Sequence, residues 1–428
     1  MPCSRTRDID SAAPPSETGA QWVIDGPISR VRQAQSPPAL QGAIWADRAL
    51  GKAEKELEPG DTGKRQPMTP TNRRAFLSLG LAAGTMALTS EAAMAAAGSS
   101  TASASPSVDP RSLIPPELLQ PLEARLSKYG DRDVDGTTVA AFRKEDAAQS
   151  TSIKSSQVHK RLIPGPVGSP EVPVFVINAT RKGEPRPAIL HMHGGGYVLG
   201  TAQSAVPSLQ QIAHDLNCAV VTVDYRLAPE TRFPGSLEDN YAALKWLWGS
   251  AAELGIDTRR IAVMGGSAGG GHAAMLAIAA RDRGEFHLAA QVLIYPMLDD
   301  RTGSSRAVPA HIGTYMWTRH SNQFGWSSLL GESAGASRVP YGAVPARLSD
   351  LSRLPPTFIG VGSIDLFVEE DIDYAQRLLA AGVPVELLVV PGAYHGFDIV
   401  APDAPLTRRF YAAQLGALRR AFSLAQSR

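Results

Sequence analysis

Short apolar runs alternate with helical patterns beyond about residue 110, and this alternation limits the fold of the chain more than any other feature. The later runs are continuous rather than alternating, which is typical of a parallel sheet with helices on both faces. The order of strand, helix and strand predicts a doubly wound, mostly parallel α/β sheet. The predicted strands are Val172–Ile177, Ala188–His193, Cys218–Val223, Arg260–Met264, Ala289–Tyr295, Thr357–Val361 and Val383–Val390.

Helical spacing of apolar residues predicts the intervening helices. They are expected around Leu237–Trp248 and at Ala268–Arg281, Glu369–Ala381 and Leu406–Ala425. Two stretches depart from the alternation: an amino-terminal region at 110–164, and an insertion at about 299–345 within a catalytic domain at 165–428. Such segments build the cap of an α/β fold. The insertion carries aromatic residues that either pack a small core of their own or line a pocket: Trp317, Phe324 and Trp326.

Residues 71–79, Thr-Asn-Arg-Arg-Ala-Phe-Leu-Ser-Leu, resemble a twin-arginine export signal, with Asn72 in place of the usual serine. The weakly apolar run Ala75–Leu88 is shorter than the roughly 20 apolar residues that a stable membrane anchor needs. Small-residue sites of the kind that signal peptidase accepts follow at 93–97. The alternative is an amphipathic start to the folded domain. The polar stretch Gly98–Ser107 disfavours it, because such a composition cannot bury a core.

These features divide the amino-terminal part of the chain. We expect a signal peptide at 68–97 and a flexible linker at 98–109, and therefore an exported protein, periplasmic or secreted, with no stable membrane anchor. Met68 lies five residues before Arg73, where the initiator of such a signal is expected. Residues 1–67 are then either upstream of the true start or a disordered extension.

Charge and cysteine content exclude some classes of partner. The formal net charge of +1 gives no electrostatic reason to expect a nucleic acid or an acidic membrane as a partner. Of the two cysteines, Cys3 falls in the expected extension, so no internal disulfide is predicted. Cys218 begins an apolar run and is predicted to be a small buried hydrophobe. The sequence specifies no oligomeric state.

Gly265-Gly266-Ser267-Ala268-Gly269 matches the G-x-S-x-G pattern of a nucleophile elbow. It follows a predicted strand and precedes a predicted helix, which is the setting that the motif requires. The sharp turn would lift the Ser267 hydroxyl above the sheet edge. Without that setting, the same residues would describe a glycine-rich structural turn.

His193-Gly194-Gly195-Gly196 ends another predicted strand. Ester hydrolysis places negative charge on the carbonyl oxygen in the transition state, and backbone N–H groups stabilise it. We predict an oxyanion hole from the amides of Gly194, Gly195 and Ala268. A phosphate-binding turn is disfavoured, because no G-x-G-x-x-G spacing opens a helix here and no P-loop lysine follows.

A serine nucleophile needs a base, and the base needs an orienting acid. In α/β folds with a nucleophile elbow, the acid follows the serine in the chain and the histidine follows the acid. Asp365 follows the predicted strand Thr357–Val361, and His395 lies in a loop after the last predicted strand. We predict these two residues as the acid and the base. Asp371 and Asp373 fall in the next helix and are expected to be solvated surface charges. The other downstream histidines are His272, on the helix behind the nucleophile, His287, His311 and His320.

Five motifs, in order, resemble those of the hormone-sensitive lipase-like esterases over roughly residues 165–425. They are His193–Tyr197, Asp224–Glu230, the Ser267 elbow, Ile364-Asp365 to Tyr374-Ala375, and His395-Gly396-Phe397. The resemblance implies an α/β-hydrolase fold with an amino-terminal helical cap. It also implies cleavage of short- to medium-chain acyl esters without metal or other cofactor, and a triad of Ser267, Asp365 and His395. The substrate is then a small-molecule ester.

One position departs from the family. The residue before the nucleophile is usually acidic in this family, and here it is Gly266. This difference affects the expected local support of the elbow and the expected substrate preference, but not the triad. The segment Asp224–Glu230 is interpreted as an internal ion-pair and turn element. Two alternative functions stay open: a hydrolase of amides, formamides, lactones or carbonates with the same triad, and a non-catalytic member that binds a small molecule in the same cleft.

Overall fold

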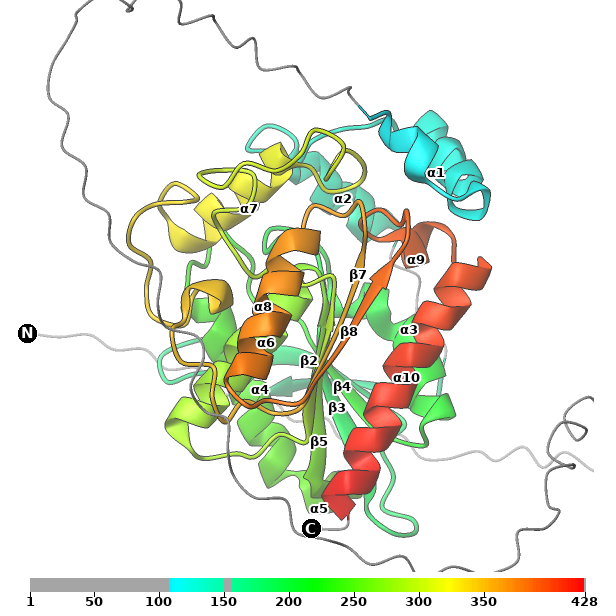
Figure 1. Ribbon diagram of the computed structural model, residues 1–428. Helices are drawn as coiled ribbons and strands as arrows, with labels where there is room; N and C mark the ends of the chain where they lie inside the picture. Colours follow the sequence, from blue (N-terminus) through cyan, green and yellow to red (C-terminus); the bar gives the residue numbers. More distant parts are fainter. Residues whose placement is uncertain (1–107, 150–154, 427–428) are drawn as a thin grey trace, which may run out of the picture. The chain divides into compact units, whose positions relative to one another are not determined.

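A computed structural model describes residues 108–149 and 155–426 (Figure 1). The expected extension at 1–67, with Cys3, the export signal at 68–97 and all but the last two residues of the linker at 98–109 lie outside the described residues.

The described chain folds around an eight-stranded sheet in the order β1-β2-β4-β3-β5-β6-β7-β8. The strands are β1 (Val158–Ile163), β2 (Val172–Ile177), β3 (Arg186–Met192), β4 (Ala219–Val223), β5 (Ile256–Gly266), β6 (Ala290–Ile294), β7 (Thr357–Gly362) and β8 (Val385–Val390). β1 and β2 pair antiparallel with each other, and β2 pairs antiparallel with β4. The remaining neighbours are parallel. The predicted mostly parallel α/β sheet is confirmed, and β1 is an additional strand.

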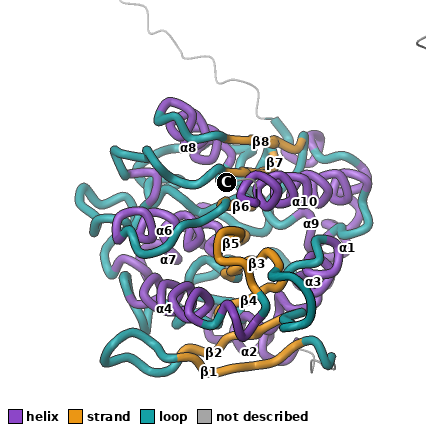
Figure 2. Tube along the Cα trace, turned by 90° about the horizontal axis from the view of Figure 1, so that it is seen from below, coloured by secondary structure: helices purple, strands orange, loops and turns teal. Residues whose placement is uncertain are grey.

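Helices cover both faces of the sheet. The helices of the described residues are α1 (Pro116–Tyr129), α2 (Val139–Gln149), α3 (Ala202–Asp215), α4 (Gly235–Gly249), α5 (Ala251–Leu254), α6 (Ala268–Arg283), α7 (Arg319–Leu330), α8 (Val368–Ala380), α9 (Phe397–Val400) and α10 (Pro405–Gln426), with short 3₁₀ turns at Pro110–Leu113 and Pro345–Arg347. Figure 2 shows α4, α6 and α8 on one side of the sheet and α3 and α10 on the other.

Burial explains why the central strands are continuously apolar. Every residue of β4, β6 and β7 is buried, as expected for strands that helices cover on both faces. Cys218, just before β4, is buried, and its burial raises the pKa of the thiol to about 12. The prediction of a buried structural cysteine is confirmed.

The two segments expected to form the cap meet near the carboxyl ends of the parallel strands. α1 and α2 belong to the amino-terminal segment, and α7 belongs to the insertion after β6. The backbone N–H of Val134 donates to the Ser321 hydroxyl at 2.9 Å, which joins the two segments. No helix in the described part of the chain combines the length and the apolar character needed to cross a membrane.

Candidate active site

Ser267 occupies a strained turn between β5 and α6. Its φ of +57° and ψ of −125° lie outside the conformations that L-residues prefer, a strain of about 1–3 kcal/mol. Its backbone N–H donates to the Ile294 carbonyl at 2.9 Å, and its carbonyl accepts from Met297 at 3.1 Å. These bonds hold the turn against the end of β6, in the strand–turn–helix arrangement that the sequence predicted.

The glycines around Ser267 allow the turn to pack closely. A Cβ at Gly265 would lie 2.3 Å from Gly269, and one at Gly269 would lie 2.1 Å from the Met192 carbonyl oxygen. Gly266 is different, because a Cβ there would make only ordinary contacts, the nearest 3.5 Å from the Tyr295 ring. The elbow therefore requires glycine at 265 and 269, whereas it has room for a side chain at 266.

The three predicted triad side chains converge across the ends of β5, β7 and β8. His395 Nε2 lies 3.0 Å from Ser267 Oγ, and His395 Nδ1 lies 2.9 Å from Asp365 Oδ2. An ionised carboxylate can only accept, so the Nδ1 proton points to Asp365 and Nε2 is free to accept from the serine hydroxyl. Asp365 is fully buried, and Ser267 and His395 are 7% and 8% exposed. The other Asp365 oxygen accepts from the Phe367 amide at 3.0 Å.

Two aromatic rings that sequence reasoning did not identify flank the imidazole. The Tyr295 ring lies 4.7 Å from the His395 ring and the Phe367 ring lies 5.2 Å from it, both edge-on. The Tyr295 hydroxyl donates to Asp398 at 2.8 Å. Tyr295 follows β6 directly and Phe367 stands two residues after Asp365, but neither residue belongs to a catalytic pattern. Together the rings restrict the tilt of the His395 side chain.

Of the predicted oxyanion-hole residues, Gly194 lies against the elbow and Ala268 belongs to it. A Cβ at Gly194 would be 2.9 Å from the Gly266 carbonyl oxygen and 3.4 Å from Ser267 Cβ, so only glycine permits this approach. Gly195, with a φ of +123°, adopts a backbone conformation that favours glycine. Ala268 is the first residue of α6, where a backbone N–H has no partner within the helix. Gly194 and Ala268 therefore border the serine, whereas the nearest neighbours of a Cβ at Gly195 belong to Leu199 and Gly200.

Aromatic and charged side chains support the glycine loop from behind. The Tyr225 hydroxyl donates to the His193 carbonyl at 2.6 Å, and the two rings stack at 4.2 Å. In the same Asp224–Glu230 segment, Arg226 pairs with Asp239 at 2.7 Å and Glu230 pairs with Arg143 of α2 at 2.7 Å. The segment thus forms ion pairs, as predicted, although its partners lie in α4 and α2 rather than within it.

The structure separates His395 from the other downstream histidines. His272 is fully buried on α6, and burial lowers its pKa to about 3. His287 and His320 are exposed, and His311 is partly exposed. Of these histidines, His395 alone contacts Ser267 through a hydrogen bond within the described residues.

One prediction about acidic residues was wrong. Asp371 was expected to be a solvated surface charge, yet it is fully buried, and burial with the nearby Glu370 and Asp365 raises its pKa well above its usual range. Asp373 is half-buried. The side chain of Asp371 faces the interior of the protein, which a sequence pattern dominated by charged residues did not reveal.

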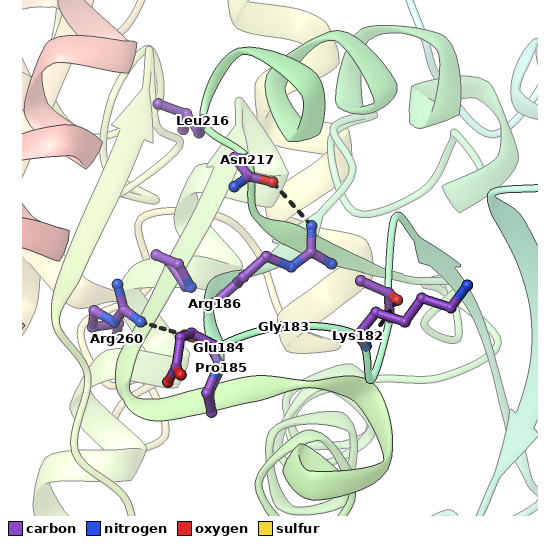
Figure 3. A pocket seen from close by; sticks show the side chains of 10 residues that line it. Lys182, Gly183, Glu184, Pro185, Arg186, Leu216, Asn217 and Arg260 are labelled. Carbon is purple, nitrogen blue, oxygen red and sulfur yellow. Dashed lines mark hydrogen bonds between the residues drawn. The ribbon is translucent and has the colours of Figure 1, made fainter.

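A cavity of about 550 Å³ lies at the amino ends of β3 and β4, beside Arg260 of β5 (Figure 3). Arg186 and Arg260 line it; Arg186 donates to the Asn217 side chain at 3.2 Å, and Arg260 donates to the Pro185 carbonyl at 2.5 Å. The triad stands at the carboxyl ends of the strands, so this cavity is separate from it. Among the described residues, no three His, Cys, Asp or Glu side chains are grouped as metal ligands would be.

Known proteins are similar to this chain in both sequence and fold. Residues 189–399 match a family described as alpha/beta hydrolase fold. Carboxylesterase NlhH of Mycobacterium tuberculosis is 34% identical over 292 residues, which cover 67% of this chain and 90% of the relative. Esterase LipI of the same species is 33% identical over 298 residues, which cover 69% and 90%.

Among solved structures, a bacterial heroin esterase superimposes with a TM-score of 0.66 at 38% identity, covering 73% of this chain and 99% of that one. Esterase LipW of Mycobacterium marinum superimposes with a TM-score of 0.60 at 34% identity, covering 74% and 98%. With the converging serine, histidine and aspartate, these similarities lead to one conclusion: the chain belongs to the serine carboxylesterases of the α/β-hydrolase family.

Proposed function

We propose that this carboxylesterase hydrolyses short- to medium-chain acyl esters of small molecules by two-step acyl transfer. Ser267 attacks the ester carbonyl while His395 takes its proton, and Asp365 stabilises the imidazolium that forms. His395 then donates the proton to the departing alcohol. Water, activated by the same imidazole, hydrolyses the acyl-enzyme and restores the serine hydroxyl. The hydrogen-bonded chain from Ser267 Oγ to His395 to Asp365, at 3.0 and 2.9 Å, is the observation that carries this proposal.

In the proposed mechanism, the amides of Gly194, Gly195 and Ala268 stabilise the oxyanion. The close approach of Gly194 to Ser267 supports this role, because donors must stand about 3 Å from the developing charge. Loss of one such donor typically lowers the rate about 100- to 1000-fold. We expect a preference for acyl chains at or below about C8, since a single covered pocket encloses small ligands.

The test is the Ser267→Ala variant with p-nitrophenyl acetate and butyrate as substrates. We expect turnover to be abolished while the melting temperature stays within a few degrees of the wild type, since Ala removes only the hydroxyl. Ser208→Ala, which removes an exposed hydroxyl from α3, serves as the matched control and retains full activity. Wild-type turnover by Ser267→Ala would refute the nucleophile assignment.

We also propose that residues 68–97 direct export by the twin-arginine route and are then removed. The paired arginines at 73 and 74, followed by Phe76-Leu77, support this proposal. Fractionation of cells expressing the full chain would give a mature protein outside the cytoplasm, beginning between residues 96 and 98 if cleavage follows Ala95 or Ala97. The variant R73K/R74K would stay inside and uncleaved. Equal export of both proteins would contradict the proposal.

A further inference from the structure

Trp317 covers the oxyanion loop from the side of the cap insertion. A Cβ at Gly196 would lie 2.0 Å from Trp317 Cη2 and 2.4 Å from Cζ2, so the six-membered part of the indole packs directly on that glycine. Trp326, from the same insertion, is fully buried and packs on Tyr197 at 5.0 Å. Trp326 is therefore a core residue, and of the two tryptophans in the insertion Trp317 is the one that packs on the oxyanion loop.

The turn that presents Trp317 is strained. The Trp317 N–H donates to the Tyr315 carbonyl at 2.8 Å, and Met316 between them has a φ of +69°. These values describe a γ-turn of the rare, strained form. Strained non-glycine residues cluster at ligand sites, where the surrounding structure must hold them in place. The contacts around Tyr315–Trp317 therefore hold this turn in a conformation that it would not adopt alone.

The same turn reaches the other side of the active site. The Met316 methyl carbon would lie 3.9 Å from a Cβ at Gly396, the residue next to His395. Met316 also accepts from Arg125 of α1 at 3.2 Å. The turn therefore spans the site from the oxyanion loop to the histidine loop, and both cap segments contribute to its position.

A second set of bonds fixes the Trp317 ring itself. Its Nε1 lies 3.3 Å from Asn322 Oδ1, and the fully buried Asn322 donates to the Thr302 carbonyl at 2.9 Å. A buried indole N–H normally requires such a partner. Because Trp317 is 6% exposed and its indole is hydrogen-bonded, it forms a fixed wall rather than a movable side chain.

The chemistry of acyl transfer distinguishes the two sides of the bound ester. The leaving oxygen must lie within reach of His395 Nε2, because that nitrogen returns the proton to it. The acyl chain is a different substituent of the same carbon and therefore leaves it in another direction than the alcohol. We propose that Trp317 closes the acyl side of the active site and sets the longest acyl chain that is hydrolysed efficiently. This inference rests on the proposed roles of Ser267 and His395.

The experiment compares wild type with Trp317→Leu on two substrate series. One series varies the acyl chain from acetate to dodecanoate with p-nitrophenol as the leaving group, and the other varies the alcohol with acetate as the acyl group. We expect the kcat/KM ratio of octanoate to butyrate to rise at least about tenfold in Trp317→Leu, because one methylene in an apolar pocket changes rates by roughly that factor. The order of preference in the alcohol series stays unchanged.

Trp248→Leu is the matched control, since this Trp packs on Phe286 at 5.4 Å and belongs to α4. It should keep the wild-type acyl profile. Trp317→Phe removes the ring atoms that touch Gly196 while keeping an aromatic side chain, and it decides the question if Trp317→Leu fails to fold. An unchanged acyl profile in the folded Trp317 variant, or a shift in the alcohol series instead, overturns the inference. A wild type that hydrolyses no ester in either series refutes the proposed function itself.

Discussion

Replacing Asp365 by Asn should disable the base without changing the shape of the site. Asp365 is fully buried, with one oxygen 2.9 Å from His395 Nδ1 and the other accepting from the Phe367 amide at 3.0 Å. In the variant, the Phe367 N–H keeps the amide oxygen on its side, so the NH₂ group faces His395. An NH₂ group can only donate, and His395 must then carry its proton on Nε2, where it cannot accept from Ser267.

The expected loss in kcat is on the order of 10⁴-fold, as for the equivalent change in other triads. It corresponds to about 5.4 kcal/mol at about 1.36 kcal/mol for each factor of ten. The assay is kcat and KM for p-nitrophenyl butyrate, with a thermal melt to verify folding. Asp373→Asn, the same change on the half-buried face of α8, is the control and should stay within about twofold of wild type. A folded Asp365→Asn enzyme within about tenfold of wild type would refute the assignment of the acid.

Three further predictions concern the elbow and the acidic helix. Gly269→Ala should lower the free energy of unfolding by about 1–3 kcal/mol in a urea titration, because its Cβ would lie 2.1 Å from a backbone carbonyl oxygen. Gly249→Ala is the control, since its Cβ would meet no neighbouring segment within 4 Å, and it should leave the free energy of unfolding unchanged. Gly266→Ala should keep its melting temperature and its kcat/KM within about threefold of wild type, since its nearest new contact is an ordinary 3.5 Å; a collapse of either would contradict the open space at 266. Burial raises the pKa of Asp371, so above about pH 4 the folded state binds more protons than the unfolded state and stability falls as pH rises. Asp371→Asn should therefore raise the melting temperature more at pH 8 than at pH 4, whereas the control Asp373→Asn should show no such difference. An equal effect of Asp371→Asn at both pH values would contradict a raised pKa for Asp371.

The convergence of Ser267, Asp365 and His395 was predictable because the geometry of the candidate site limits the sequence strongly. The sharp turn at Ser267 excludes side chains at 265 and 269, and the close approach at 194 requires glycine as well. These requirements leave a visible pattern of glycines after apolar runs. The parallel order of the strands then brings Asp365 and His395, which are distant in sequence, to the same edge of the sheet.

Other parts of the fold leave no such pattern. β1 carries His159, Lys160 and Arg161, and it lies at the sheet edge, where most of its side chains remain partly or fully exposed. A strand of this composition is indistinguishable from a polar loop until its partner is known. The burial of Asp371 likewise depends on contacts with distant segments. So does the difference between Trp317, which packs on the oxyanion loop, and Trp326, which packs in the core. Trp317 lies in a turn before α7, and Asp371 lies among charged residues of α8, so apolar periodicity predicts neither environment.

Covalent labelling of the wild-type protein tests the central claim most directly. A fluorophosphonate should react with one hydroxyl, the one that the His395 imidazole activates. Mass spectrometry of the digested protein should place the adduct on Ser267, with labelling abolished in His395→Ala, which retains the serine. Stoichiometric labelling of another residue, or undiminished labelling without His395, would contradict the account.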